Sequence, residues 1–150
     1  MNASNWKIDP YMTEVSKVVL KNLVRKKEEK DRFERLAQKW SFAMFLVGLG
    51  TFLYLFLVIW PKVLVQHVNL VYMLMSDKVI MGAIFLYGLS LFQFSFYKKK
   101  HKKADEEFEL VRNDVIERGD ELWSEPEQWK NRHHILAFMK SEYNINIYHK

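Results

Sequence analysis

Two long apolar stretches without charge dominate the pattern of hydrophobic and polar positions along the chain. The first covers residues 41–60 and the second residues 79–97, and neither contains Asp, Glu, Lys, Arg or His. A helix of about twenty residues, rising roughly 1.5 Å per residue, matches a bilayer hydrocarbon core of roughly 30 Å. The pattern therefore predicts two transmembrane helices.

The segments on either side of these stretches are charged and predict further helices. Residues 11–39 contain neither Gly nor Pro, and Asp9 with Pro10 fits a helix start. Apolar stripes mark both ends of this segment, at Val15, Val18, Val19 and Leu23 and again near Trp40, while its highly charged middle has no apolar face. We expect one long helix that continues into the first span, with its middle solvated.

The distribution of basic residues predicts the orientation in the membrane. Ten Lys and Arg precede residue 41, two lie in residues 61–78 and eleven follow residue 97. Positive charge is retained on the cytoplasmic side, so both termini should be cytoplasmic and the loop outside. The first apolar run begins forty residues into the chain, which favours a retained anchor over a signal peptide. We expect a multi-pass protein of the cell membrane.

The predicted fold class is all-α: an integral membrane helical hairpin of two transmembrane helices with long cytoplasmic helical extensions. Its segments are a cytoplasmic N-terminal helical arm (1–40), a transmembrane helix (41–60), an extracytoplasmic loop (61–78), a second transmembrane helix (79–97) and a cytoplasmic helical C-terminal arm (98–150). Pro61 and Lys62 favour an end to the first span. Residues 63–75 are mostly apolar but too short for an easy crossing. We expect them to lie at the outer interface or to extend the hairpin as a short helix. Whether they form an external contact surface, rest on lipid headgroups or dip into the outer membrane face stays open.

Aromatic and basic residues lie at the predicted membrane boundaries. The expected lipid-interface anchors are Trp40, Trp60, Tyr97, Lys98, Lys99, Lys100, Lys102 and Lys103. The five lysines can attract anionic lipid headgroups with roughly 1 kcal/mol per charge near the surface. Such a cluster can also bind nucleic acid phosphates. Its position directly after a span, and the mixing of acids with bases elsewhere, favour membrane lipids, so we expect no nucleic acid partner.

Small residues recur seven positions apart within each span. Ala43 and Gly50 share one face of the first span, and Ala83 and Ser90 share one face of the second. Small side chains let transmembrane helices approach closely. These four residues therefore predict the seam of a left-handed antiparallel helix pair.

An apolar stripe follows the second span on the C-terminal arm. Phe108, Val111, Val115 and Leu122 recur at helical spacing. An isolated amphipathic helix needs a cover. Two covers remain open: the N-terminal arm of the same chain in an antiparallel coiled-coil pair, or an oligomer or partner protein that uses this interaction stripe.

The sequence Ser-Glu-Pro-Glu at residues 124–127 predicts the start of a last helix. Ser124 would cap it, and Glu127 would complete a capping box three residues later. A break is expected near Trp123. The final residues 143–150 predict a short strand or an ordered tail.

The sequence shows no recognisable catalytic chemistry. Cysteine is absent, which excludes disulfides, thiolate metal sites and cysteine nucleophiles. No nucleotide-binding, metalloprotease or serine-hydrolase motif occurs. The adjacent His133 and His134 point about 100° apart on a helix, which makes a poor joint metal site. We expect the acidic residues 105–109 to face water beside the lysines. The sequence therefore predicts a protein that is not an enzyme and holds no cofactor or metal.

The layout resembles a known family. A charged forty-residue arm, the span SFAMFLVGLGTFLYLFLVIW, a brief loop, a second span ending FYKKKHKK and a tail with SEPEQW are similar to the small two-span YpbF-type membrane proteins of Gram-positive bacteria. The resemblance implies a bacterial plasma membrane. It implies no activity and no binding residues.

These observations support one leading functional hypothesis. It is a non-catalytic integral membrane protein that presents a cytoplasmic helical module for self-association or for docking an unidentified partner protein. The alternative is a small oligomeric pore or holin-like membrane protein, suggested by two short spans with charged ends. A third class, nucleic acid tethered at the membrane, predicts salt-sensitive DNA binding by the arms.

Overall fold

The computed structural model describes residues 12–66 and 69–148, and over these residues the chain is helical without any strand. The all-α prediction is thereby confirmed. The chain divides into two compact units. We call Met1–Arg32 together with His101–Lys150 the terminal unit, and Phe33–Lys100 the hairpin unit.

Two long helices run through both units and carry most of the structure. The elements are α1 (Glu14–Tyr54), the π-helix η2 (Leu55–Ile59), α2 (Trp60–Gln66), α3 (Leu70–Ser76), α4 (Lys78–Glu117), α5 (Gly119–Leu122) and α6 (Pro126–Tyr143). By length and composition, Glu14–Val65 and Lys78–Glu117 are each long and apolar enough to cross a membrane.

The start of α1 is set by a threonine cap. The Ser16 backbone N–H donates to Thr13 Oγ1 at 3.0 Å, which satisfies one of the unpaired N–H groups of the first turn. The predicted start at Asp9 and Pro10 lies outside the described residues. From Glu14 the helix continues without a break into the first apolar stretch, as the sequence predicted.

The first apolar stretch does not end its helix at Pro61. A proline inside an α-helix lacks an N–H, and its ring collides with the carbonyl four residues earlier, which here belongs to Leu57. The preceding turn is a π-helix in which the Trp60 N–H donates to the Leu55 carbonyl, five residues back. This wider turn accommodates the ring, since π-bulges relieve such conflicts. The helix therefore continues to Gln66, past the predicted end of the span at Pro61 and Lys62. Where the span itself ends stays a prediction.

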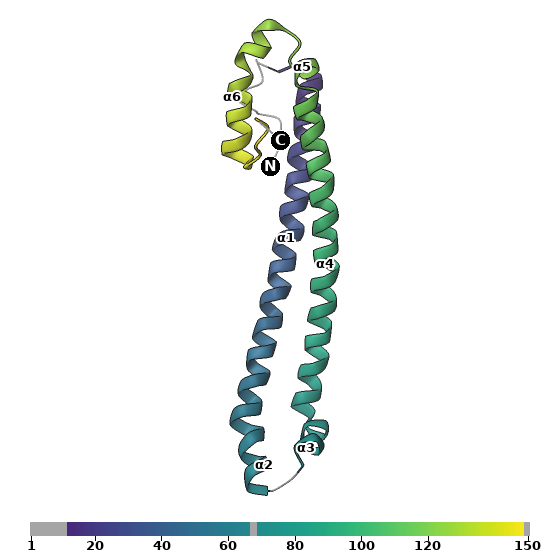
Figure 1. Cartoon of the computed structure of the whole chain (residues 1–150), viewed down its shortest axis with the longest axis vertical. Coiled ribbons are helices and arrows are strands. Elements are labelled where there is room, and N and C mark those ends of the chain that lie inside the picture. The colour runs from purple at the N-terminus through teal and green to yellow at the C-terminus, as the bar shows by residue number, and fades with distance from the viewer. Residues whose placement is uncertain (1–11, 67–68, 149–150) are drawn as a thin grey trace. The chain divides into compact units, whose positions relative to one another are not determined.

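The terminal unit has a closed apolar core. Side chains from α1, α4, α5, α6 and the C-terminal tail meet in one cluster. Figure 1 shows α6 beside the paired α1 and α4 of this unit. The buried members are Met12, Leu20, Leu23, Val24, Phe108, Val115, Leu122, Trp123, Ile135, Leu136, Met139, Ile145 and Ile147.

The last helix begins one residue later than a Ser124 cap requires. Pro126 occupies its first turn, and Glu125 is extended at φ −82° and ψ 138°. A proline ring disfavours the helical conformation of the residue before it. Glu125 therefore becomes the N-cap, without a side-chain capping bond. The predicted cap at Ser124 and the capping box with Glu127 are wrong.

A left-handed residue turns the chain back at the end of α6. Asn144 has φ 54°, and the Ile145 N–H donates to the Met139 carbonyl at 3.0 Å. Such a six-to-one bond is typical of a Schellman ending. The following segment forms no strand over the described residues, and it buries Ile145 and Ile147 in the core. Of the two predicted forms, the ordered tail is the one observed.

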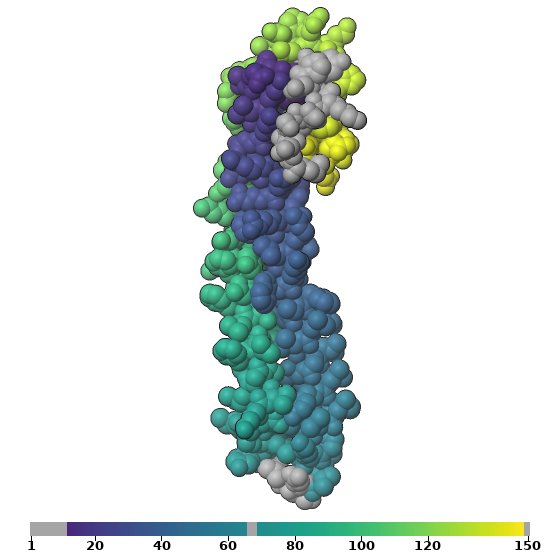
Figure 2. Space-filling view, turned by 180° about the vertical axis from the view of Figure 1, so that it is seen from behind, coloured from purple at the N-terminus to yellow at the C-terminus, as the bar shows by residue number. Residues whose placement is uncertain are grey.

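The hairpin unit, unlike the terminal unit, exposes its large apolar side chains. In both views α1 and α4 lie side by side here (Figures 1 and 2). The most apolar 18-residue windows of the two long helices are only 6% and 11% buried. Six phenylalanines are each 61% to 68% exposed: Phe42, Phe45, Phe52, Phe56, Phe85 and Phe92. This unit therefore turns its large apolar side chains outward.

Candidate functional site

The predicted interaction stripe lies inside the terminal unit. Phe108, Val115 and Leu122 are buried, and Val111 is partly buried against the same core. The cluster also includes Leu23 of the N-terminal arm. Within this chain the stripe is thus covered by its own arm, and it offers no open face to a partner.

The face that α1 contributes to this core differs from the predicted one. Val15 and Val18 are 63% and 66% exposed, whereas Leu20 and Leu23 are fully buried. Ser16 completes the buried face, at helical spacing from both leucines. Of the predicted stripe, Leu23 is buried and Val19 packs against the core, whereas Val15 and Val18 do not; the prediction left out Leu20 and the serine.

Ser16 joins two elements that are far apart in the sequence. It is fully buried, and its Oγ donates to the Leu122 carbonyl of α5 at 2.8 Å. Its hydroxyl also lies 2.6 Å from Thr13 Oγ1. Sequence reasoning missed this contact, and its only signal is a small polar residue in the register of an apolar face.

Ion pairs connect α1 with α4 next to the core. Lys26 Nζ lies 2.5 Å from Glu107 Oε2, and Lys30 Nζ lies 2.5 Å from Asp105 Oδ1. The lysine side chains are only 22% and 20% exposed, and the Lys30 ammonium lies 5.0 Å from the Phe108 ring centroid. The middle of the arm is therefore solvated only in part. Glu107 pairs with Lys103 of the lysine cluster, as expected, but Glu107 and Asp105 also pair with α1, which the sequence did not predict.

These contacts shift the ionisation of both acids. The hydrogen bond from Lys26 lowers the pKa of Glu107, and the bond from Lys30 lowers the pKa of Asp105. The Glu107 bond in turn raises the pKa of Lys26. Burial opposes each shift without reversing it. The charged forms are thus the ones that the folded terminal unit favours.

The predicted lipid-interface anchors are mostly exposed. Trp60 is 52% exposed, and Trp40 and Tyr97 are half-buried. The lysines at 98–100, 102 and 103 are all exposed. The Lys100 ammonium lies 4.6 Å from the Phe96 ring centroid, within the hairpin unit. Their anchoring role stays a prediction.

The predicted seam of small residues is only partly closed. Ala43 and Ala83 are half-buried, and Ser90 is buried with its Oγ donating to the Leu86 carbonyl at 2.9 Å. Gly50 is exposed, and a Cβ added there would meet no other atom within 4 Å. The expected close approach of the helices at Gly50 is therefore wrong, because a hollow lies beside this residue.

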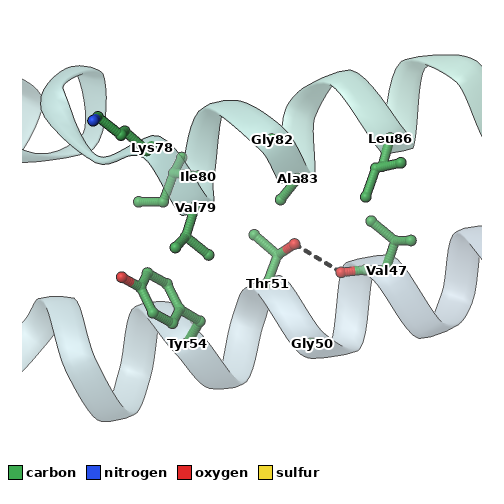
Figure 3. A pocket seen from close by; sticks show the side chains of 10 residues that line it. All are labelled: Val47, Gly50, Thr51, Tyr54, Lys78, Val79, Ile80, Gly82, Ala83 and Leu86. Atoms are coloured by element: carbon green, nitrogen blue, oxygen red, sulfur yellow. Dashed lines mark hydrogen bonds between the residues drawn. The ribbon is translucent and has the colours of Figure 1, made fainter.

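This hollow is a groove of about 340 Å³ between α1 and α4 of the hairpin unit. Figure 3 shows side chains from the two helices facing each other across it. The α1 residues are Val47, Gly50, Thr51 and Tyr54, and the α4 residues are Lys78, Val79, Ile80, Gly82, Ala83 and Leu86. Sequence reasoning missed the groove, because Gly50 and Ala83, which line it, were interpreted as contact points.

A polar contact closes one end of the hairpin. The Tyr54 hydroxyl donates to Asp77 Oδ2 at 2.9 Å. Asp77 Oδ1 accepts the N–H groups of Val79 at 2.8 Å and Ile80 at 3.2 Å, which caps α4. An acid just before the second apolar stretch was the available signal for this cap.

The terminal unit also carries a second hollow, of about 370 Å³, on its surface. Trp129 and Tyr148 line it and are 42% and 41% exposed. The Arg132 guanidinium stacks on Trp129, with 3.4 Å between its central carbon and the ring centroid. Trp123 forms part of the buried wall. We call this hollow the tryptophan pocket.

In residues 12–66 and 69–148 no group of three His, Asp or Glu side chains has an arrangement that could hold a metal ion. The rings of His133 and His134 lie in contact, with centroids 3.9 Å apart. His133 Nδ1 lies 3.0 Å from the Lys130 carbonyl oxygen. This pair is therefore engaged in local contacts on α6.

Comparison with known proteins agrees with the resemblance seen in the sequence. The chain is similar to the Bacillus subtilis (strain 168) protein named "Uncharacterized protein YpbF", with 23% identity over 146 residues, 94% of this chain and 92% of the relative. No solved structure matches the chain. The family model described as "Protein of unknown function (DUF2663)" matches residues 19–150. The chain therefore belongs to this DUF2663 family of YpbF-type proteins.

Proposed function

We propose that this protein is a non-catalytic integral membrane protein. Its hairpin unit crosses the cell membrane twice, and its terminal unit is a cytoplasmic module that docks a second copy or a partner protein. The observation that carries the proposal is the contrast between the two units. One closes a core of its own, and the other turns its largest apolar side chains outward.

The outward apolar surface supports a bilayer as the environment of the hairpin unit. Soluble proteins rarely expose contiguous apolar patches larger than a few hundred Å². A helix in the core of a soluble protein buries its most apolar segment. In the two long helices here, only 6% and 11% of the most apolar 18-residue segment is buried. In a bilayer these side chains contact hydrocarbon chains and not water, so their exposure carries no free-energy penalty.

The basic residues support an orientation with both termini in the cytoplasm. The loop between the two apolar stretches has two Lys or Arg, compared with ten before and eleven after the stretches. The exposed lysines at 98–103 are available for anionic headgroups on the inner face. The same count supports an outer position for α2 and α3.

The tryptophan pocket supports a docking role for the terminal unit. Tryptophan, tyrosine and arginine dominate the binding energy of protein interfaces. Trp129, Arg132 and Tyr148 combine these three types around one hollow. The core stripe is not available for docking, because its residues are already buried within the chain.

No observation in the described residues favours the pore alternative. A pore needs polar groups along its path, and both apolar stretches lack charged side chains. The hydroxyls of Thr51 and Ser90 bond to carbonyls of their own helices. The proposal therefore rests on docking and not on conduction.

Photo-crosslinking in native membranes tests the docking role. A benzoylphenylalanine at Tyr148 should form an adduct with another polypeptide, either a second copy or a partner. Arg132→Ala should reduce the yield at least fivefold. The same probe at the buried Val115 is the control and should react only within the chain. Intramolecular adducts alone at Tyr148 would contradict the proposal.

A further inference from the structure

We propose that the groove between α1 and α4 of the hairpin unit binds one acyl chain of a phospholipid, with the phosphate at Lys78. This inference rests on the proposed membrane insertion of the hairpin unit. The relevant side chains are those of the 340 Å³ groove shown in Figure 3.

The groove presents an apolar surface along its length. Thr51 is the one hydroxyl in its middle, and it donates to the Val47 carbonyl at 2.7 Å. That bond turns the hydroxyl back toward its own helix and leaves the methyl group to contact a ligand. Gly50 and Gly82 add no side chain, and a Cβ added at each would contact no neighbouring side chain or facing helix within 4 Å. The surface is therefore suited to methylene groups and contains no unpaired hydroxyl that excludes them.

The length of the groove favours a lipid chain over a second helix. On α4 its lining extends from Lys78 to Leu86, a rise of eight residues, which is about 12 Å at 1.5 Å per residue. One leaflet contributes about half of the 30 Å hydrocarbon thickness. The groove thus matches the depth of a single leaflet, whereas a packed transmembrane helix runs along both.

The polar end of the groove carries the charge that a phosphate requires. Lys78 is exposed, and the described residues offer it no ion pair. The neighbouring acid, Asp77, is occupied by the Tyr54 hydroxyl and two backbone N–H groups. Lys62 adds a second positive charge near Asp77. Two cations and one acid leave a net positive end, which attracts the phosphate of a phospholipid.

The test uses the full-length chain in nanodiscs that contain phosphatidylglycerol with a photoreactive diazirine in its acyl chain. Mass spectrometry locates the adducts. We expect them to concentrate on residues 47–54 and 78–86. Filling the groove with Gly50→Leu and Gly82→Leu should lower the adducts there at least fivefold. Lys78→Gln should lower the preference for phosphatidylglycerol over phosphatidylcholine at least threefold.

Gly88→Leu is the matched control. Gly88 also has open space around it but does not line this groove, so the substitution should leave the adducts unchanged. Helix content by circular dichroism shows that each variant is folded.

Equal labelling of the filled and control variants overturns the inference, as does labelling spread evenly over both apolar stretches. Crosslinks between two copies through the groove would assign it to a second chain instead. Each of these results leaves membrane insertion intact. Release of the unmodified protein from native membranes by alkaline carbonate contradicts the proposed function itself.

Discussion

Ser16 shows how one polar side chain holds the terminal unit together. It is fully buried, and its hydroxyl satisfies the Leu122 carbonyl 106 residues away in the sequence. A buried carbonyl without a partner costs about 1–3 kcal/mol. The serine thus links α1 to α5, and an apolar residue in its place would leave the Leu122 carbonyl without this partner.

Substitution of one buried and one exposed leucine tests the described core of the terminal unit. Leu23 is fully buried, whereas Leu110 is 69% exposed. Leu23→Ala should lower the free energy of unfolding of the terminal unit by about 2–5 kcal/mol, because it leaves a cavity. Leu110→Ala should change it by less than about 0.5 kcal/mol. Denaturant unfolding of the full chain in detergent, followed by tryptophan fluorescence, measures both. Equal effects would mean that the described core is incorrect.

Spacing predicted Phe108, Val115 and Leu122 as one face, because apolar residues at helical intervals must be covered. It did not predict which surface covers them. Ser16 was missed because its hydroxyl gains a partner only when the chain folds back. Ser124 was assigned as a cap from its residue type and from the spacing to Glu127, but the proline two positions later makes Glu125 the N-cap.

The contact between α1 and α4 combines an apolar core with two ion pairs. Lys26 and Lys30 lie four residues apart on α1 and meet Glu107 and Asp105 in reverse order on α4. This pairing specifies an antiparallel register, since a shift by one turn breaks both contacts. The acidic run therefore positions the helix, in addition to neutralising nearby lysines.

The ion pairs predict a loss of stability at acidic pH. The folded-state pKa values of Asp105 and Glu107 are lowered, so their contribution is present above the unfolded values of about 4. It is lost as the pH falls through the lower folded-state values. The thermal unfolding midpoint of the terminal unit should therefore decrease when the pH is lowered below about 4. Asp105→Asn with Glu107→Gln should reduce this dependence, measured by circular dichroism in detergent.

The exposed Glu106 supplies the control for this experiment. It lies 3.9 Å from Lys102 and is 63% exposed, so Glu106→Gln should leave the pH dependence unchanged. A double variant at positions 105 and 107 with the same acid dependence as the original chain would contradict the role of the pairs.

Helix content was predictable here, and helix endings were not. Residues 11–39, which lack Gly and Pro, indicated the first part of α1. The two apolar stretches and the helical spacing of apolar residues after residue 97 indicated the rest of α1 and α4. Pro61 was expected to end the first span, and the sequence did not predict that one widened turn lets the helix continue beyond it. The groove beside Gly50 and Gly82 was also unpredictable, because small residues permit close approach without requiring it.

The whole chain combines two units with opposite surfaces. The terminal unit buries its apolar residues, and the hairpin unit exposes them. The sequence indicated this division through two uncharged stretches between charged arms. The groove and the tryptophan pocket depend on how the helices pack within each unit, which spacing along the chain does not specify.

Cysteine accessibility tests the proposed arrangement in the membrane most directly, because the chain has no cysteine of its own. Single cysteines replace Asn69 in the predicted outer loop and Ser124 in the terminal unit, both exposed in the structure. In intact cells a membrane-impermeant maleimide should label Asn69→Cys and leave Ser124→Cys unlabelled until the membrane is permeabilised. Labelling of Ser124→Cys in intact cells, or protection of both positions from the reagent, would contradict two crossings with cytoplasmic termini.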